Sequence, residues 1–424
     1  MGWDRHSAIR FRALVVAMAA STGLAAEFPP NPSRGQEVIP SCVLDLADMP
    51  PNWRPGASAA KRAQLSHEPW NAVETADSAR AVERGLDEMI AFFRGKPWRV
   101  LQLGDDAIES FLDVAHAAGQ QPALQRRARA QAAAMLELCA RPWVKRDVES
   151  IRATDFETLI TLTIHAHQLL PADSGVTKAL AARCNRALSS AGSLRRATGF
   201  NIETLNATQP VDVNRAYDLV MWCITMIDAQ TVPELHLGDE ARKFALVVWP
   251  YVAAYPLKNA RDLTANPTFY NLAYLATHIG YIPTGYGRHG LYIEDAPQLY
   301  RFLRENFYPV LGIGELDLLA EFVDLLRQLG CSEDNDLQVR DGARYLLSLY
   351  HSAGESWMAH REPNEHGRSS DYDLLHKPWT GISGVRRRVA EPPSDGTYGN
   401  VFRILFPGPT GALCSQCERD RHRY

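Results

Sequence analysis

Segments with the spacing of amphipathic helices follow one another along most of this chain, and they constrain its fold more than any other feature. In residues 76–94, for example, Leu86 and Phe93 lie two helical turns apart on one apolar face. Glycine and proline separate the segments, and the alternating pattern of a strand is almost absent. About eleven helices are predicted in this way, over residues 76–94, 105–118, 122–140, 154–170, 175–191, 212–228, 239–254, 268–280, 296–309, 314–329 and 335–353.

The predicted fold class is therefore all-α, with one large helical domain over residues 76–355. Helices of this length can pair either into an α/α toroid or into an irregular helical bundle. Residues 244–254 are apolar on more than one side, which is typical of an inner helix of a two-layer toroid. No sequence repeat is present, so a motif-defined solenoid is not indicated.

Both ends of the chain differ from this helical middle. Residues 1–25 combine a basic start, a short apolar run and small residues, which is the layout of a secretory signal peptide. Residues 26–75 start rich in proline and indicate an extended arm. Residues 356–424 carry little helical pattern, and we expect an irregular C-terminal extension. The mature protein is expected to be secreted or periplasmic, without an integral membrane segment.

The charge of the chain narrows the class of partner. The formal net charge is -4, so no basic excess is available to neutralise a phosphate backbone. Nucleic acid is therefore not expected as a partner, whereas a polysaccharide or an acidic small molecule stays open. The sequence does not indicate the oligomeric state.

Cysteine usage indicates a mixture of roles. There are seven cysteines, an odd number, so at least one thiol is not paired within the chain. Cys139, Cys184 and Cys223 lie in apolar helical patterns and are predicted to be buried thiols.

One stretch, residues 266–308, concentrates side chains that can carry chemistry. It holds many of the fifteen tyrosines and a glycine-rich loop, and glycine lets a backbone approach a ligand closely. Tyr270, Tyr274 and His278 are spaced by four residues and therefore share a helix face. Such a face can line a pocket, or it can form an aromatic core layer whose polar tips are hydrogen-bonded.

These residue types suit proton transfer beside an acidic sugar. The candidate catalytic residues are His278, Tyr281, Tyr286, Arg288 and His289. The candidate substrate-binding residues are Asn271, Tyr270, Tyr274 and Trp249. His278, with Tyr281 or Tyr286, is assigned the proton transfer, because histidine and tyrosine can remove or deliver protons. Arg288 and Asn271 are assigned an acidic group of the substrate, and His289 its orientation. The ring of Trp249 is a candidate for stacking on a sugar.

Two groups of side chains raise the question of a metal site. Glu109, Asp113 and His116 share a helix face, but the second carboxylate-x-x-His of a helix-bundle site is missing. Residues 351–376 hold several histidines among acids, in no established zinc spacing. These histidines are His351, His360, His366 and His376. The segment is interpreted as a surface segment or as a loop that closes over the Tyr/His face. No metal ligand and no cofactor is predicted.

Three functions stay open at this point. The leading hypothesis is an exported enzyme that acts on a glycan, either a polysaccharide lyase with Tyr/His proton transfer or a glycan-active hydrolase. The second is a non-catalytic helical scaffold or binding protein in the periplasm or outside the cell. The third is a metal-dependent oxidoreductase that uses histidines of residues 351–376. Neither GxSxG nor HExxH is present to suggest a serine hydrolase or a zinc protease.

Overall fold

The fold is all-α, as predicted. The computed structural model describes residues 42, 46, 47, 49–56, 59, 68–118, 121–206, 209–257, 267–288, 290, 291, 293–363 and 369–386. These residues form fourteen α-helices and no strand, which is close to the helix number expected. No helix in this part of the chain is long and apolar enough to cross a membrane. The predicted signal peptide, residues 1–25, lies outside the described residues.

The helices follow one another with short connections. The first seven are α2 (Ala72–Phe93), α3 (Pro97–Leu103), α4 (Asp105–Ala117), α5 (Pro122–Lys145), α6 (Phe156–Leu169), α7 (Gly175–Ala191) and α8 (Leu194–Thr198). The others are α9 (Val213–Ala229), α10 (Gly238–Ala253), α11 (Pro267–Thr284), α12 (Pro297–Ile313), α13 (Leu316–Gln328), α14 (Leu337–Ser352) and α15 (Asp371–Val385). Short 3-10 turns lie at η1 (Pro51–Trp53), η2 (Val148–Ser150), η3 (Ala153–Asp155), η4 (Ile202–Thr204) and η5 (Ile293–Asp295).

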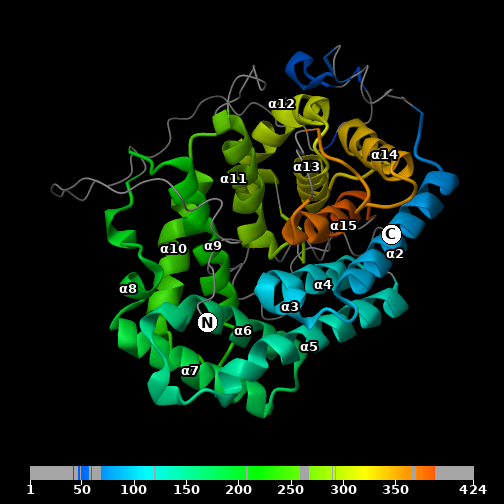
Figure 1. The fold of residues 1–424 in the computed structure, drawn as a ribbon. Coiled ribbons are helices and arrows are strands. Elements are labelled where there is room, and N and C mark those ends of the chain that lie inside the picture. The colour runs from blue at the N-terminus through cyan, green and yellow to red at the C-terminus, as the bar shows by residue number, and fades with distance from the viewer. Residues whose placement is uncertain are drawn as a thin grey trace, which may run out of the picture.

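Six helices form a closed inner ring, as Figure 1 shows. In ring order they are α4, α6, α9, α11, α13 and α15, and α15 packs back against α4. Each inner helix packs against an outer helix, which is α5, α7, α10, α12, α14 and α2 in the same order. This two-layer ring is an α/α toroid, one of the two architectures expected.

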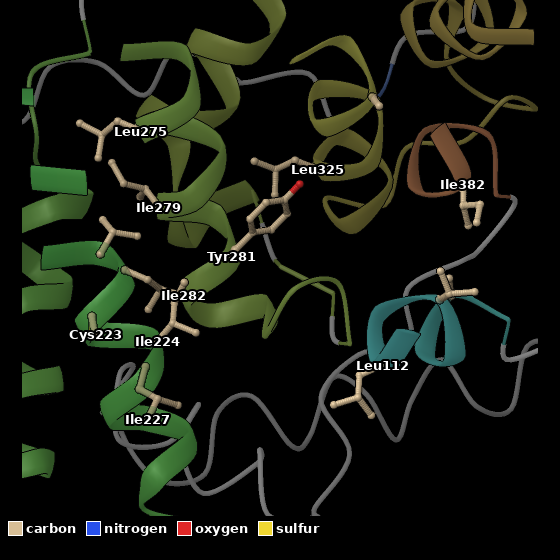
Figure 2. Close-up of a cluster of buried hydrophobic side chains, with 14 of the residues drawn as sticks. Leu112, Cys223, Ile224, Ile227, Leu275, Ile279, Tyr281, Ile282, Leu325 and Ile382 are labelled. Carbon is tan, nitrogen blue, oxygen red and sulfur yellow. The ribbon is translucent and has the colours of Figure 1, made fainter. Parts of the chain in front are cut away.

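Burial follows the two layers. In the inner helix α13 every residue except Asp317 is buried, because the helix meets neighbours on all sides. Apolar side chains of the inner ring fill the space between helices; Figure 2 shows Ile224 and Ile227 of α9 with Ile279 and Ile282 of α11.

The expectation that residues 244–254 form an inner helix is wrong. They belong to α10, which packs against α9 from the outer layer. Leu246 and Pro250 are apolar but lie on the exposed side of this helix, and they give it the pattern of a buried one. Single exposed apolar residues are normal on a protein surface.

The irregular extension expected over residues 356–424 contains a helix. α15 packs against α13, α2 and α4 and completes the inner ring. Its sequence hides the helical pattern, since Pro378, Gly381 and Gly384 all have low helix propensity. The glycines are needed for packing, because a Cβ on Gly381 would lie 2.5 Å from the Trp357 ring.

The proline-rich arm is attached to the toroid where it is described. Trp53 of η1 is buried, and its ring lies edge-on to that of Tyr300, with centroids 5.9 Å apart. Gln338 donates a hydrogen bond to the Trp53 carbonyl. A disulfide joins Cys42 to Cys331, which follows α13. The predicted buried thiols are confirmed at positions 139, 184 and 223.

Candidate functional site

The inner ring carries a set of polar and aromatic side chains that interact with one another, which we call the central cluster. They come from α4, α9, α11, α13 and α15, and from the loop after α11. Its members are Asp105, Asp106, Glu109, Asp113, Tyr217, Tyr274, His278, Tyr281, Tyr286, Arg288, Asp317, Glu321, Asp324, His376, Trp379 and Arg386. Helices far apart in the sequence thus place acids, bases and aromatic rings together.

His278 of α11 is a buried, neutral histidine with a defined tautomer. Its Nδ1 lies 2.9 Å from the Tyr274 carbonyl oxygen, which can only accept, so Nδ1 carries the proton. Nε2 therefore accepts a hydrogen bond from the Tyr217 hydroxyl at 3.0 Å. Burial lowers the pKa of His278 to about 4. Glu321 lies 3.8 Å from Nδ1 and accepts a 2.5 Å hydrogen bond from Thr277 instead. Burial and Glu321 raise the pKa of the Tyr217 hydroxyl well above its ordinary value, so in the resting site the proton of this hydrogen bond lies on Tyr217.

His376 of α15 has the opposite character. Its Nδ1 lies 3.2 Å from the Asp317 carboxylate, which also accepts a 2.8 Å hydrogen bond from the Tyr274 hydroxyl. Burial disfavours the imidazolium, but the carboxylates of Asp317 and Asp106 outweigh it and raise the pKa of His376. Conversely, although burial acts against its ionised form, His376 and Tyr274 lower the pKa of Asp317. His376 is therefore the histidine of the cluster whose surroundings favour the charged form.

The inner face of α4 carries four acids, Asp105, Asp106, Glu109 and Asp113, and burial raises the pKa of all four, which favours their neutral form. Burial and neighbouring carboxylates raise the pKa of Asp106 to about 7 and that of Glu109 well above its usual range. Burial also raises the pKa of Asp113 to about 7, although Trp379 donates a hydrogen bond to it at 3.1 Å. Carboxyl groups in this state can donate hydrogen bonds as well as accept them.

The loop after α11 is held in an unusual backbone conformation. The φ values of Gly285, Tyr286 and Gly287 are 55°, 54° and 80°. These values lie in the left-handed region, which residues other than glycine seldom adopt. The Tyr286 ring stacks on Tyr281, with centroids 5.2 Å apart and an interplanar angle of 30°. Figure 2 shows the Tyr281 hydroxyl directed toward α13. A strained residue persists only where its surroundings hold it, so these contacts fix the Tyr286 ring in the cluster.

Charged side chains of α13 and α15 hold the same loop from the other side. Arg386 donates two hydrogen bonds to Asp324, at 3.1 and 2.8 Å, and Gln328 donates a third at 2.6 Å. Gly287 packs directly on Arg386 and Gln328, where a Cβ would lie 2.6 and 2.8 Å from their nitrogens. The end of α15 thereby sets the position of the loop.

The structure brings together most of the predicted catalytic residues. His278, Tyr281, Tyr286 and Arg288 all belong to the central cluster. The Arg288 guanidinium lies 3.7 Å from the Asp228 carboxylate, which offsets part of its charge. His289 lies outside the described residues.

The predicted substrate-binding residues are dispersed. Tyr274 donates a hydrogen bond to Asp317, an acid of the cluster. Asn271 donates a hydrogen bond to Asn214 near the starts of α11 and α9. Tyr270 is half-buried against the hydrophobic core, and Trp249 is buried in the outer helix α10.

The histidine-rich segment 351–376 divides between surface and centre. His376 enters the cluster through α15. His351 is exposed and lies 2.6 Å from Asp77, while His360 is buried 3.7 Å from Glu362. His366 lies outside the described residues. Among the described residues of this segment, His376 therefore reaches the Tyr/His face.

Several cluster residues were not selected from the sequence. Asp317, Glu321 and Asp324 lie at i, i+4 and i+7 of a helix that is otherwise buried and largely apolar. Burying a charged acid in such a helix costs free energy unless the acid is paired. The three acids could therefore have been selected from the sequence as candidate functional residues. Tyr217 carries no comparable signal, because a tyrosine on an amphipathic helix is ordinary.

Two other features do not form a candidate site. Within the described residues, one group of three potential metal ligands lies close together, Cys42, Cys331 and Asp336, but its two sulfurs form a disulfide. A surface hollow of about 380 Å³ is lined by residues 149–154 and Ser190, and it contains none of the cluster residues. The central cluster is therefore the candidate active site.

Comparison of the chain with protein-family models, with curated proteins and with solved structures finds no match. The function is therefore argued from the cluster itself.

Proposed function

We propose that this protein is an exported enzyme that cleaves a glycan by lyase-type proton transfer. The observation that carries the proposal is the opposite character of two histidines in one chain of contacts. His278 is neutral and accepts from Tyr217, whereas His376 is paired with a carboxylate. Titratable groups whose surroundings push their pKa values apart are the usual sign of an acid and a base.

The residues suit an elimination in which each proton has a donor and an acceptor. Because burial raises the pKa of Tyr217 well above its ordinary value, its proton moves to Nε2 of His278 in the same step in which the Tyr217 oxygen takes the proton from the sugar carbon next to the carboxylate. The electron pair left on that carbon forms the double bond, and the bond to the glycosidic oxygen breaks. His376 delivers its proton to this departing oxygen. Asp317 orients His376 and favours its charged form, as a carboxylate does behind a histidine.

The acids of α4 are compatible with an acidic sugar because they favour the protonated form. A neutral Glu109 or Asp106 side chain can donate a hydrogen bond to a substrate carboxylate, while an ionised one would repel it. Arg288 adds a positive charge beside Glu109. These groups would bind the substrate carboxylate and increase the acidity of the adjacent carbon.

Export is supported by two features. Residues 1–25 have the layout of a signal peptide, and Cys42 and Cys331 form a disulfide. Disulfides persist mainly in oxidising compartments such as the periplasm or the cell exterior.

A panel of acidic and neutral polysaccharides tests the proposal. The expected result is an unsaturated product, seen by ultraviolet absorbance, from an acidic polysaccharide. Tyr217→Phe, His278→Gln and His376→Asn should each reduce kcat by about 100-fold or more while circular dichroism stays unchanged. The exposed His351→Gln is the control and should leave the activity as it is.

The pH profile gives an independent test. The rate should rise as the pH passes about 4, where His278 loses its proton, and fall where His376 loses its own, above the ordinary histidine value. Reducing ends without an unsaturated product would show hydrolysis and contradict elimination. Full activity in folded His278→Gln and His376→Asn would exclude the assigned residues.

A further inference from the structure

Two aromatic side chains are exposed beside the central cluster. Trp98 of α3 is 53% exposed and Tyr372 of α15 is 39% exposed, and they are the two aromatic residues among the large exposed apolar side chains of the described chain. Exposed rings of this size lose apolar contact with the core, so their exposure calls for an explanation.

An ion pair joins the residues that adjoin the two rings in the sequence. Arg99 follows Trp98, and its guanidinium lies 2.9 Å from the carboxylate of Asp371, which precedes Tyr372. The same guanidinium lies 5.2 Å from the Trp98 ring. Both charged groups are largely buried, at 14% and 19% exposure, so the junction of α3 and α15 is fixed.

The exposed ring of Tyr372 lies against His376, the proposed general acid. It stacks on His376 with centroids 5.0 Å apart and an interplanar angle of 22°. His376 in turn meets the Trp379 ring edge-on at 5.2 Å, and Trp379 donates its hydrogen bond to Asp113 of α4. A column of rings thus leads from the surface to the acids of the cluster, and Tyr372 is its exposed end.

We propose that Trp98 and Tyr372 form a platform on which a sugar ring of the glycan stacks beside His376. This inference rests on the proposed function and extends it. The C–H groups on one face of a pyranose pack on an aromatic face, while its hydroxyls stay in water. A platform directly above the proton donor would hold the sugar that carries the departing oxygen. An uncharged stacking surface accepts acidic and neutral sugars, and the α4 acids and Arg288 then select between them.

Binding without turnover tests the platform. Tyr217→Phe serves as the background, and hexasaccharides of galacturonate and of N-acetylglucosamine serve as probes in isothermal titration calorimetry. Adding Trp98→Ala or Tyr372→Ala should weaken binding of the better probe by about tenfold each. Tyr372→Phe should keep the affinity, because stacking does not need the hydroxyl. Leu246→Ala, exposed on α10, is the control and should also keep it.

The outcomes separate the platform from the proposed chemistry. Equal affinity in the background and in both alanine variants overturns the platform, as does the absence of saturable binding to either probe. Full turnover by Tyr217→Phe would contradict the proposed proton transfer and leave the affinity comparison intact.

Discussion

At the scale of single residues, the charge of each histidine ring depends on the group that lies beside its Nδ1 atom. His278 meets a backbone carbonyl and is buried, so the neutral form is favoured. His376 meets the Asp317 carboxylate, which stabilises the imidazolium in spite of burial. Tyr274 connects the two rings. Its carbonyl oxygen accepts a hydrogen bond from His278, and its hydroxyl donates one to Asp317, which lies beside His376. One tyrosine therefore links a base to an acid.

Asp341 of α14 gives a test of how burial affects an acid away from the cluster. It is 1% exposed, accepts a 2.7 Å hydrogen bond from Tyr308, and burial raises its pKa to about 7. Since the folded pKa exceeds the unfolded value, the folded state binds the proton more tightly. That stabilisation is complete below about pH 4 and is lost as the pH rises through 7.

Asp341→Asn should therefore gain stability relative to the wild type between about pH 4 and pH 7. Urea unfolding across this range measures the difference. The exposed Asp87→Asn is the control and should follow the wild type at every pH. Parallel curves for Asp341→Asn and the wild type would mean that the folded state does not raise this pKa.

At the scale of elements, α15 shows that packing overrides intrinsic propensity. Glycine costs about 1 kcal/mol in a helix and an internal proline about 3 kcal/mol, yet α15 is a helix. Gly381 lets the Trp357 ring lie against the backbone, and Gly384 does the same for Leu346 and Ala320. Trp357 is also held by a hydrogen bond to the Ala81 carbonyl. The close approach joins α15 to its neighbours in both layers.

Gly384→Ala should be destabilising by about 1–3 kcal/mol, although alanine is the better helix former. The new Cβ would lie 2.5 Å from Leu346 and 2.9 Å from the Ala320 backbone. The matched control is Gly175→Ala in α7, where no atom lies within 4 Å and stability should be unchanged or slightly increased. Chemical denaturation compares the two, and equal stability would show that α15 packs less closely.

At the scale of the whole molecule, the ring closes only when distant parts of the chain meet. α15 packs against α2 in the outer layer and against α4 in the inner ring. The disulfide between Cys42 and Cys331 joins residues 289 positions apart and attaches the arm beside α13. Because each inner helix packs against the next, the loss of one such helix–helix contact would expose the packed surfaces of two helices.

Removal of the disulfide by Cys42→Ser with Cys331→Ser should lower the free energy of unfolding by about 2–5 kcal/mol. The cause is the larger conformational entropy of an unfolded chain without the cross-link. Thermal unfolding of the wild type with and without reductant is the internal control. Reductant should lower the wild-type Tm and leave the double variant unaffected; equal stability of all three samples would contradict the role assigned to the bond.

Helical periodicity is local information, and for this reason the sequence alone determined the all-α class, most helix positions and the buried thiols. It also selected His278, Tyr281, Tyr286 and Arg288, because they lie within a few residues of one another. Their partners Tyr217, Asp317 and His376 lie on other helices, and no local pattern relates positions that far apart. Only the closed ring decided that α10 is outside, that α15 is a helix, and which acid each histidine meets, since burial and charge depend on neighbours in space.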